Sequence, residues 1–155
     1  MNWLPYIVSV LIAQGAGGIG GFFTASKIPT WYMTLVMPSW QPPSWVFGPV
    51  WTTLYFLMGV AAAMIWSQRK QSPQAKTALI VYGVQLVLNI LWSVFFFGLQ
   101  SPALAFVCIV VLWLAIVATI YHFWRIRRVA GVLLIPYIFW VGFASVLNYT
   151  IWSLN

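Results

Sequence analysis

The 155-residue sequence contains neither aspartate nor glutamate, and only 5% of its residues are charged. A soluble domain of this size usually has about 25% charged residues, so the composition argues against an ordinary soluble protein. The missing carboxylates also exclude three kinds of mechanism. These are acid–base catalysis by a carboxylate pair, metal binding in a carboxylate cage, and coupled transport through an acidic proton relay.

Cysteine and histidine occur once each. Cys108 cannot form an internal disulfide, and within an apolar run an unpaired thiol is usually a small hydrophobic residue. His122 is the only side chain expected to titrate near neutral pH, and its position close to Arg125 favours a solvated, interfacial role. No Cys/His spacing resembles a zinc or haem-attachment site, so no metal site is predicted.

The seven Lys and Arg residues give a formal net charge of +7. In a soluble protein this balance would suggest nucleic acid, but these charges are few and are clustered between apolar runs. No nucleic-acid partner is therefore expected. The basic residues are better explained by attraction to anionic membrane lipids and by control of membrane orientation.

Long apolar runs dominate the sequence, which is 63% hydrophobic. A helix rises about 1.5 Å per residue, so about 20 apolar residues cross a hydrocarbon core about 30 Å thick. The runs are continuous rather than alternating, which favours helices over a β-barrel. The first run lacks an initial basic residue and a credible cleavage site, so we assign it as a spanning helix rather than a signal peptide. We predict an all-α membrane protein, one domain over residues 1–155, with five transmembrane helices at about 4–26, 46–66, 78–98, 102–124 and 129–153.

The basic residues are distributed unequally between the two ends of this predicted bundle. The loops on the N-terminal side contain Arg69, Lys70, Lys76, Arg125, Arg127 and Arg128. The opposite side contains only Lys27. The positive-inside rule then predicts a cytoplasmic N-terminus and an external C-terminus if the protein is bacterial, and only the relative sidedness if it is mitochondrial.

The segment 27–45 between the first two helices is rich in proline and tryptophan. Prolines at positions 29, 38, 42 and 43 forbid a continuous helix and stiffen the chain. Trp31, Trp40 and Trp45 suit either an aromatic belt at the membrane interface or a folded cap over the mouth of the bundle. For the whole segment we favour a structured capping loop.

This segment and the helices that follow resemble the TspO/MBR family of tryptophan-rich sensory proteins and translocator proteins, also called peripheral-type benzodiazepine receptors. The matching residues in the loop are Trp31, Tyr32, Leu35, Pro38, Ser39, Trp40, Pro42 and Pro43. Those in the helices are Pro49, Trp51, Leu54, Tyr55, Gln85, Asn89, Trp92, Phe96, Phe97, Gly98, Pro136, Tyr137, Trp140, Phe143, Ala144, Leu147 and Asn148. The resemblance covers most of the chain in the right order, and the combined pattern is highly specific.

Helical spacing places these residues on three stripes that mix aromatic side chains with amides or hydroxyls. The stripes contain Trp51, Tyr55, Met58 and Ala62; Gln85, Asn89, Trp92, Ser93 and Phe96; and Tyr137, Trp140, Val141, Ala144 and Asn148. Such stripes suit a pocket for a large, flat, mostly apolar ligand. For Gln85, Asn89 and Asn148, hydrogen bonding between packed helices is the alternative. With the family resemblance added, the predicted ligand site comprises Trp31, Tyr32, Trp40, Pro42, Trp51, Tyr55, Gln85, Asn89, Trp92, Ser93, Phe96, Tyr137, Trp140, Ala144 and Asn148.

The resemblance implies a receptor or sensor for protoporphyrin IX or another small apolar ligand, linked to tetrapyrrole homeostasis and stress regulation, with no obligatory cofactor. It also implies two alternatives. One is light- and oxygen-dependent porphyrin degradation, with Trp51 and Trp140 in the catalytic role, and the other is a tetrapyrrole or lipid carrier. Lys27 is either a partner for a porphyrin propionate or a lysine that snorkels to the headgroups.

Departures from the family pattern and the oligomeric state complete the sequence predictions. Met37 stands where many members have lysine, which weakens any electrostatic grip on acidic ligands. No basic residue follows Tyr149, so the cholesterol-recognition pattern is incomplete and no dedicated cholesterol site is predicted. Gly17 and Gly21 allow close helix approach, either within one bundle or between two, and the family resemblance implies a homodimer.

Overall fold

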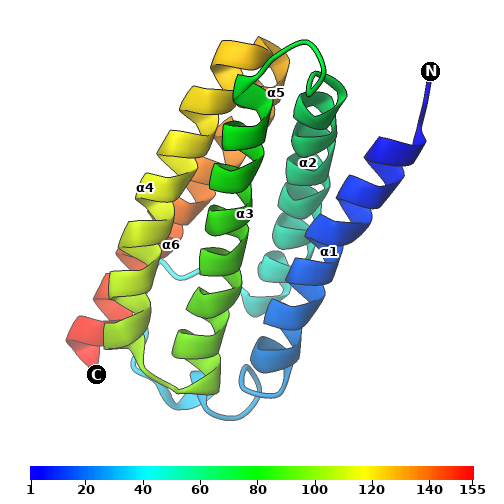
Figure 1. The fold of residues 1–155 in the computed structure, drawn as a ribbon. Helices are drawn as coiled ribbons and strands as arrows, with labels where there is room; N and C mark the ends of the chain where they lie inside the picture. The colour runs from blue at the N-terminus through cyan, green and yellow to red at the C-terminus, as the bar shows by residue number, and fades with distance from the viewer.

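The computed structural model describes residues 1–155 and contains only helices and connecting loops. Five segments are long and apolar enough to cross a membrane. The predicted all-α bundle of five transmembrane helices is thus confirmed (Figure 1). The elements are α1 (Leu4–Ala25), η1 (Tyr32–Thr34), η2 (Ser44–Val46), α2 (Phe47–Ser67), α3 (Gln74–Ser93), the π-helical turn η3 (Val94–Gly98), α4 (Pro102–Ile126), α5 (Arg128–Leu133) and α6 (Ile135–Leu154).

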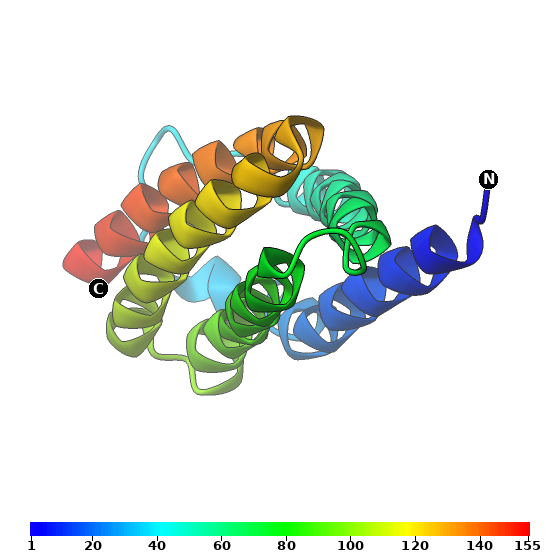
Figure 2. The same ribbon diagram turned by 45° about the horizontal axis from the view of Figure 1, so that its top comes forward.

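The long helices lie roughly side by side along one axis, and the two termini lie at opposite ends of the bundle (Figure 1). Helix α1 packs mainly against α2, and α3 packs mainly against α4. With the top of the bundle turned forward, the short η1 helix of the loop is seen between the long helices (Figure 2). The α2–α3 and α4–α5 connections lie at the N-terminal end, while the proline-rich loop lies at the C-terminal end.

Two helix boundaries differ from the predicted ranges for identifiable reasons. Helix α3 begins at Gln74, before the predicted 78, and therefore includes Lys76 in its first turn. A lysine is tolerated there because its apolar stem lies along the helix while the ammonium reaches the interface. The fifth span breaks at Leu134 into α5 and α6, because Pro136 has no N–H to bond the carbonyl four residues earlier.

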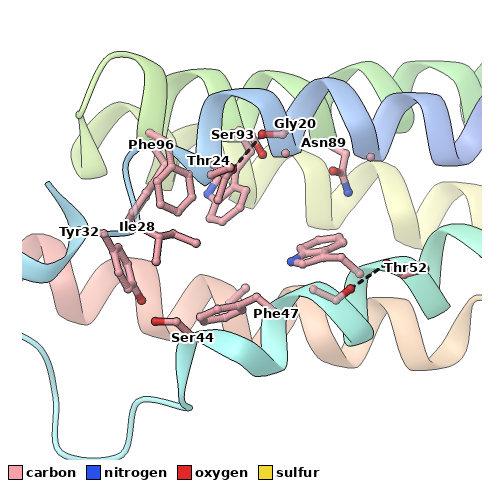
Figure 3. A pocket seen from close by; sticks show the side chains of 18 of the residues that line it. Gly20, Thr24, Ile28, Tyr32, Ser44, Phe47, Thr52, Asn89, Ser93 and Phe96 are labelled. Atoms are coloured by element: carbon pink, nitrogen blue, oxygen red, sulfur yellow. Dashed lines mark hydrogen bonds between the residues drawn. The ribbon is translucent and has the colours of Figure 1, made fainter. Parts of the chain in front are cut away.

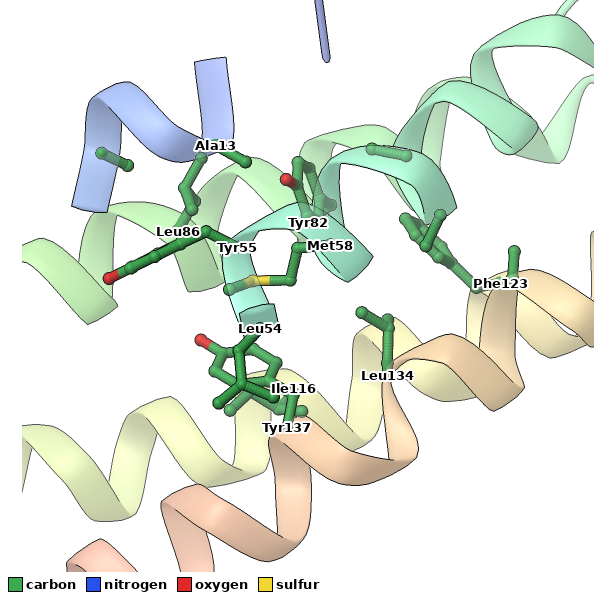
Figure 4. Close-up of a cluster of buried hydrophobic side chains, with 14 of the residues drawn as sticks. Ala13, Leu54, Tyr55, Met58, Tyr82, Leu86, Ile116, Phe123, Leu134 and Tyr137 are labelled. Carbon is green, nitrogen blue, oxygen red and sulfur yellow. The ribbon is translucent and has the colours of Figure 1, made fainter. Parts of the chain in front are cut away.

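Small and apolar residues fill the interior, while large apolar residues cover the outside. Figure 4 shows Tyr55 and Met58 of α2 packed with Leu86 of α3 and Tyr137 of α6. Phe22 and Phe139 are instead more than 70% exposed, at 78% and 73%. In a membrane this outer surface faces lipid, so close packing of small residues rather than exclusion of water holds the helices together.

Gly59 of α2 lies directly against the backbone of α1 at Val10. A Cβ atom at this position would lie 2.5 Å from the Cα of Val10 and 2.9 Å from its nitrogen. Because backbone atoms cannot move aside, we expect Gly59→Ala to lower the free energy of unfolding by about 1–3 kcal/mol. Gly83→Ala is the matched control, since a Cβ there meets nothing within 4 Å. Unfolding by SDS in mixed micelles measures both variants, and equal stabilities would contradict this view of the α1–α2 contact.

Candidate ligand cavity

A cavity of about 610 Å³ occupies the half of the bundle nearest the proline-rich loop. Its walls come from α1, α2, α3, η3, α6 and the loop, and Figure 3 shows Tyr32, Phe47 and Phe96 around its loop end. The volume lies within the range of about 300–1,000 Å³ that small-molecule sites usually have. None of the residues that line the cavity is charged.

Ten of the fifteen residues predicted to bind ligand line this cavity. They are Tyr32, Trp51, Tyr55, Asn89, Trp92, Ser93, Phe96, Trp140, Ala144 and Asn148. The other five lie outside the lining: Trp31, Trp40, Pro42, Gln85 and Tyr137. Lys27 is also outside the lining, although its neighbour Ile28 contributes to it.

Aromatic rings form one continuous wall of the cavity. The Trp51 ring lies 5.6 Å from Tyr55 and 6.5 Å from Trp92, with interplanar angles of 30° and 31°. The Trp92 ring in turn lies 5.5 Å from Phe96 at 33°. Four rings of similar tilt therefore follow one another along the wall, and a flat ligand can stack against such a surface.

Trp140 of α6 belongs to a second aromatic group, between Phe47 at 6.0 Å and Phe143 at 5.4 Å. Its indole N–H is buried and has no hydrogen-bond partner in the chain. A buried donor without a partner costs about 1–3 kcal/mol. Its position on a cavity-lining side chain makes it a candidate donor to an acceptor on a ligand.

A chain of hydrogen bonds runs from the cavity into the bundle interior. The Tyr55 hydroxyl donates to Asn89 Oδ1 at 2.6 Å, and Asn89 Nδ2 donates to the Tyr137 hydroxyl at 2.7 Å. The Tyr137 hydroxyl donates to Gln85 Oε1 at 2.7 Å, and Gln85 Nε2 donates to the Met58 sulfur at 3.7 Å. Gln85 is fully buried and connects helices, whereas Asn89 both connects helices and lines the cavity.

Asn148 orients one of the cavity tryptophans. Its Oδ1 accepts a hydrogen bond from Trp92 Nε1 at 2.9 Å, while its Nδ2 donates to the Pro102 carbonyl at 2.8 Å. One amide of α6 thereby ties α3 to the first residue of α4. Asn148, like Asn89, therefore both hydrogen-bonds between helices and lines the cavity.

The sequence prediction assigned no ligand residue to α1, yet α1 forms one side of the cavity. Gly17, Gly18, Gly20 and Gly21 line it, and the only advance signal was their spacing. A Cβ at Gly17 would lie 2.6 Å from the Tyr55 ring, so this glycine serves packing within the bundle. Further residues that the sequence prediction missed are Gln14, Thr24, Ala25, Ile28, Ser44, Trp45, Phe47, Gly48, Thr52, Phe97, Leu147 and Ile151.

The cavity is open on the side between α1 and the start of α2. Gly18, Gly21 and Gly48 line it, and a Cβ at any of the three would meet nothing within 4 Å. Farther from the loop, Gln14 Nε2 of α1 donates to the Thr52 carbonyl of α2 at 2.9 Å and joins the two helices. Gly18, Gly21 and Gly48 are all exposed, so we infer that the cavity reaches the outer surface of the bundle at a gap between these glycines.

The proline-rich loop is folded onto the bundle and closes the end of the cavity. The Trp31 and Tyr32 rings pack on Phe96 and Phe97 at centroid distances between 5.7 and 6.4 Å. Burial raises the pKa of Tyr32 above its ordinary value. The last residue, Asn155, accepts from the backbone N–H of Val36 and donates to its carbonyl, both at 2.9 Å.

Five spanning helices around an uncharged, tryptophan-lined cavity define a multi-pass integral membrane protein with a pocket of ligand size. Residues 8–153 match the model of the TspO/MBR family, and the chain belongs to this family. It is 45% identical over 152 residues to the tryptophan-rich protein TspO of Chlorobaculum tepidum, covering 98% of this chain and 96% of that protein. It is 39% identical over 155 residues to the tryptophan-rich sensory protein of Cereibacter sphaeroides, covering 100% and 94%. It is 34% identical over 154 residues to the translocator protein of Bos taurus, covering 99% and 91%.

Proposed function

We propose that this protein is a membrane receptor that binds porphyrins such as protoporphyrin IX in the cavity and so senses their level. The observation that carries the proposal is the lining itself. Four tryptophans, at positions 45, 51, 92 and 140, surround a volume of about 610 Å³ that contains no charged side chain. Two relatives carry the names sensory protein and translocator protein, which suit a ligand-responsive membrane protein.

The shape and polarity of the cavity support a flat, amphipathic ligand. The macrocycle would stack on the wall formed by Trp51 and Trp92, where offset-stacked aromatic contacts are favourable. The propionates would point toward the loop, because no charged residue inside the cavity could neutralise them. Lys27 is the one basic residue at the loop end of the bundle and would meet a propionate at the headgroup level.

We infer the membrane orientation from the same distribution of charge. Six of the seven Lys and Arg residues lie at the N-terminal end of the bundle, which the positive-inside rule assigns to the cytoplasm in a bacterium. The capping loop and the end of the cavity that it closes would then lie on the external side of the membrane. The homodimer stays a prediction, and no dedicated cholesterol site is proposed.

Titration with protoporphyrin IX in the dark, followed by tryptophan fluorescence, tests the binding proposal. We expect saturable quenching, with affinity lowered about twofold to tenfold in Trp51→Phe and in Trp140→Phe, because an aromatic contact contributes about 0.5–1.5 kcal/mol. Trp3→Phe is the control, since Trp3 lies outside the cavity and is 61% exposed. Non-saturable quenching that is the same in all four proteins would mean that porphyrin only partitions into the micelle.

A second candidate function is light- and oxygen-dependent breakdown of the bound porphyrin. The observation in its favour is that Trp51 and Trp140, on different helices, line the same cavity. We expect illumination in air to produce a new absorbing species with the native protein, and none with the double variant Trp51→Phe/Trp140→Phe at saturating porphyrin. A receptor without turnover would give no product in the light, and a carrier would instead give porphyrin flux across vesicles.

A further inference from the structure

A second hollow, of about 490 Å³, lies at the other end of the bundle between the end of α2 and the start of α3. Figure 1 shows these two helix ends side by side at the N-terminal end, away from the ligand cavity. The hollow has a cationic part and an apolar part. Its lining consists of Trp66, Arg69, Pro73, Lys76, Leu79 and Ile80.

The cationic part is held in place before any ligand arrives. The Arg69 guanidinium lies 4.2 Å above the Trp66 ring, and its Nη1 donates to the Trp66 carbonyl at 2.9 Å. The other N–H groups of the guanidinium remain free to bind an anion, and a planar guanidinium suits a phosphate. Arg69 has no carboxylate side chain to pair with, since the chain contains no Asp or Glu.

Lys76 and the start of α3 add to the positive potential on the other side of the hollow. Helix α3 begins at Gln74 with neither an acidic residue in its first turn nor a side-chain cap. The positive end of the helix dipole therefore remains uncompensated beside the Lys76 ammonium. Together with Arg69, these groups provide charge complementarity for one phosphate.

The apolar part determines which phosphate-containing molecule fits. Leu79 and Ile80 continue the hollow one turn along α3, in the direction of the membrane interior. Ile80 is 58% exposed and Trp66 is 46% exposed, so both present apolar surface to the surroundings. A free phosphate ion gains nothing from this surface, whereas the acyl chain of a lipid covers it.

We propose that this hollow, the α2–α3 lipid site, binds one anionic phospholipid, with its phosphate between Arg69 and Lys76 and an acyl chain along Leu79 and Ile80. The site is separate from the porphyrin cavity and does not depend on the proposed function. It also gives a role to two of the basic residues that lie at the N-terminal end of the bundle.

Native mass spectrometry of delipidated protein in detergent, titrated with dioleoyl phosphatidylglycerol, tests the site. Arg69→Gln/Lys76→Gln removes two charges at the hollow, and Arg127→Gln/Arg128→Gln removes two charges at the same end of the bundle. The four side chains are all exposed, so we expect both variants to fold, which unfolding by SDS checks. We expect the first variant to weaken binding of the first lipid at least about tenfold, which is about 1.4 kcal/mol, and the second to change it less than about twofold.

Two further arms separate a lipid site from simpler explanations. Dioleoyl phosphatidylcholine should bind the native protein at least about tenfold more weakly than phosphatidylglycerol. Inorganic phosphate at millimolar concentration should fail to displace the bound lipid. Equal losses in the two double variants would overturn the proposal in favour of diffuse attraction between charges. Efficient displacement by inorganic phosphate would overturn it in favour of a site for free anions. Equal binding of the two lipids would overturn it as well, because the site would then not select for an anionic headgroup.

Discussion

Gly21→Phe and Gly48→Phe should each lower the affinity for protoporphyrin IX at least about tenfold, or about 1.4 kcal/mol. Both glycines line the cavity on its open side, and a Cβ at either meets nothing within 4 Å. A Cβ atom can therefore be added at either position without a backbone shift, and we expect the phenylalanine ring to fill the gap between α1 and α2. Because both rings would occupy the same gap, the double variant should weaken binding by less than the product of the two single effects.

The control for this prediction is Gly15→Phe. A Cβ at Gly15 also meets nothing within 4 Å, and Gly15 lies on α1 but outside the cavity lining. It therefore receives the same ring on the same helix without blocking the gap. Dark titration by fluorescence gives the affinities, and unfolding by SDS verifies that all variants fold. Unchanged affinity in Gly21→Phe and Gly48→Phe would show that porphyrin does not occupy this cavity.

Asn89→Leu should have the largest effect on stability among the polar variants, with the free energy of unfolding lowered by about 1–3 kcal/mol. Asn89 is 2% exposed, and its amide both accepts from Tyr55 and donates to Tyr137. Leucine would leave the Tyr55 hydroxyl without its acceptor and the Tyr137 hydroxyl without this donor. A single hydrogen bond between membrane helices is worth about 0.6 kcal/mol on average, so we expect Tyr55→Phe to cost less than Asn89→Leu.

Thr150→Val is the control for this prediction, because the Thr150 hydroxyl bonds only the Val146 carbonyl of its own helix. Its stability should stay within about 0.5 kcal/mol of the native protein. The double variant Asn89→Leu/Tyr137→Phe should cost less than the sum of the single variants, since both remove the same bond. Strict additivity, or equal cost in Asn89→Leu and Thr150→Val, would contradict a connected hydrogen-bond chain.

The fold was predictable because hydrocarbon allows few alternatives. A chain in hydrocarbon must satisfy its backbone hydrogen bonds internally, and this requirement, together with five long runs that are continuous rather than alternating, specifies five spanning helices. The exact ends of the helices were harder to predict, because a charged residue does not always mark the end of an apolar run. Lys76 lies inside α3 because its stem is long enough to snorkel, and the break before Pro136 depends on a local loss of one hydrogen bond.

The cavity was predictable where helical spacing and composition coincide. Trp51 and Tyr55, or Asn89 and Trp92, share a face by spacing alone, and the structure places these four side chains on one wall. Gln85 has the same spacing but points into the hydrogen-bond chain. Depth within the bundle decides between these outcomes, and depth depends on how the helices pack against one another.

The part of the cavity formed by α1 could not be predicted from single residues. A glycine contributes no side chain to a stripe, so its role depends on what packs against it. Gly17 lies against Tyr55, while Gly21 borders an opening. Likewise, Asn155 and Val36 are hydrogen-bonded although 119 residues separate them in the sequence. No local sequence pattern could indicate such a contact.

The most direct test of the central claim is a crystal structure of the native protein grown with protoporphyrin IX in the dark. The account predicts electron density for one macrocycle inside the cavity, stacked along the wall that contains Trp51 and Trp92 and within reach of Trp140. The propionates should extend toward the capping loop. Porphyrin density found only on the lipid-facing outer surface, with the cavity occupied by solvent or lipid, would contradict the assignment of this cavity as a porphyrin site.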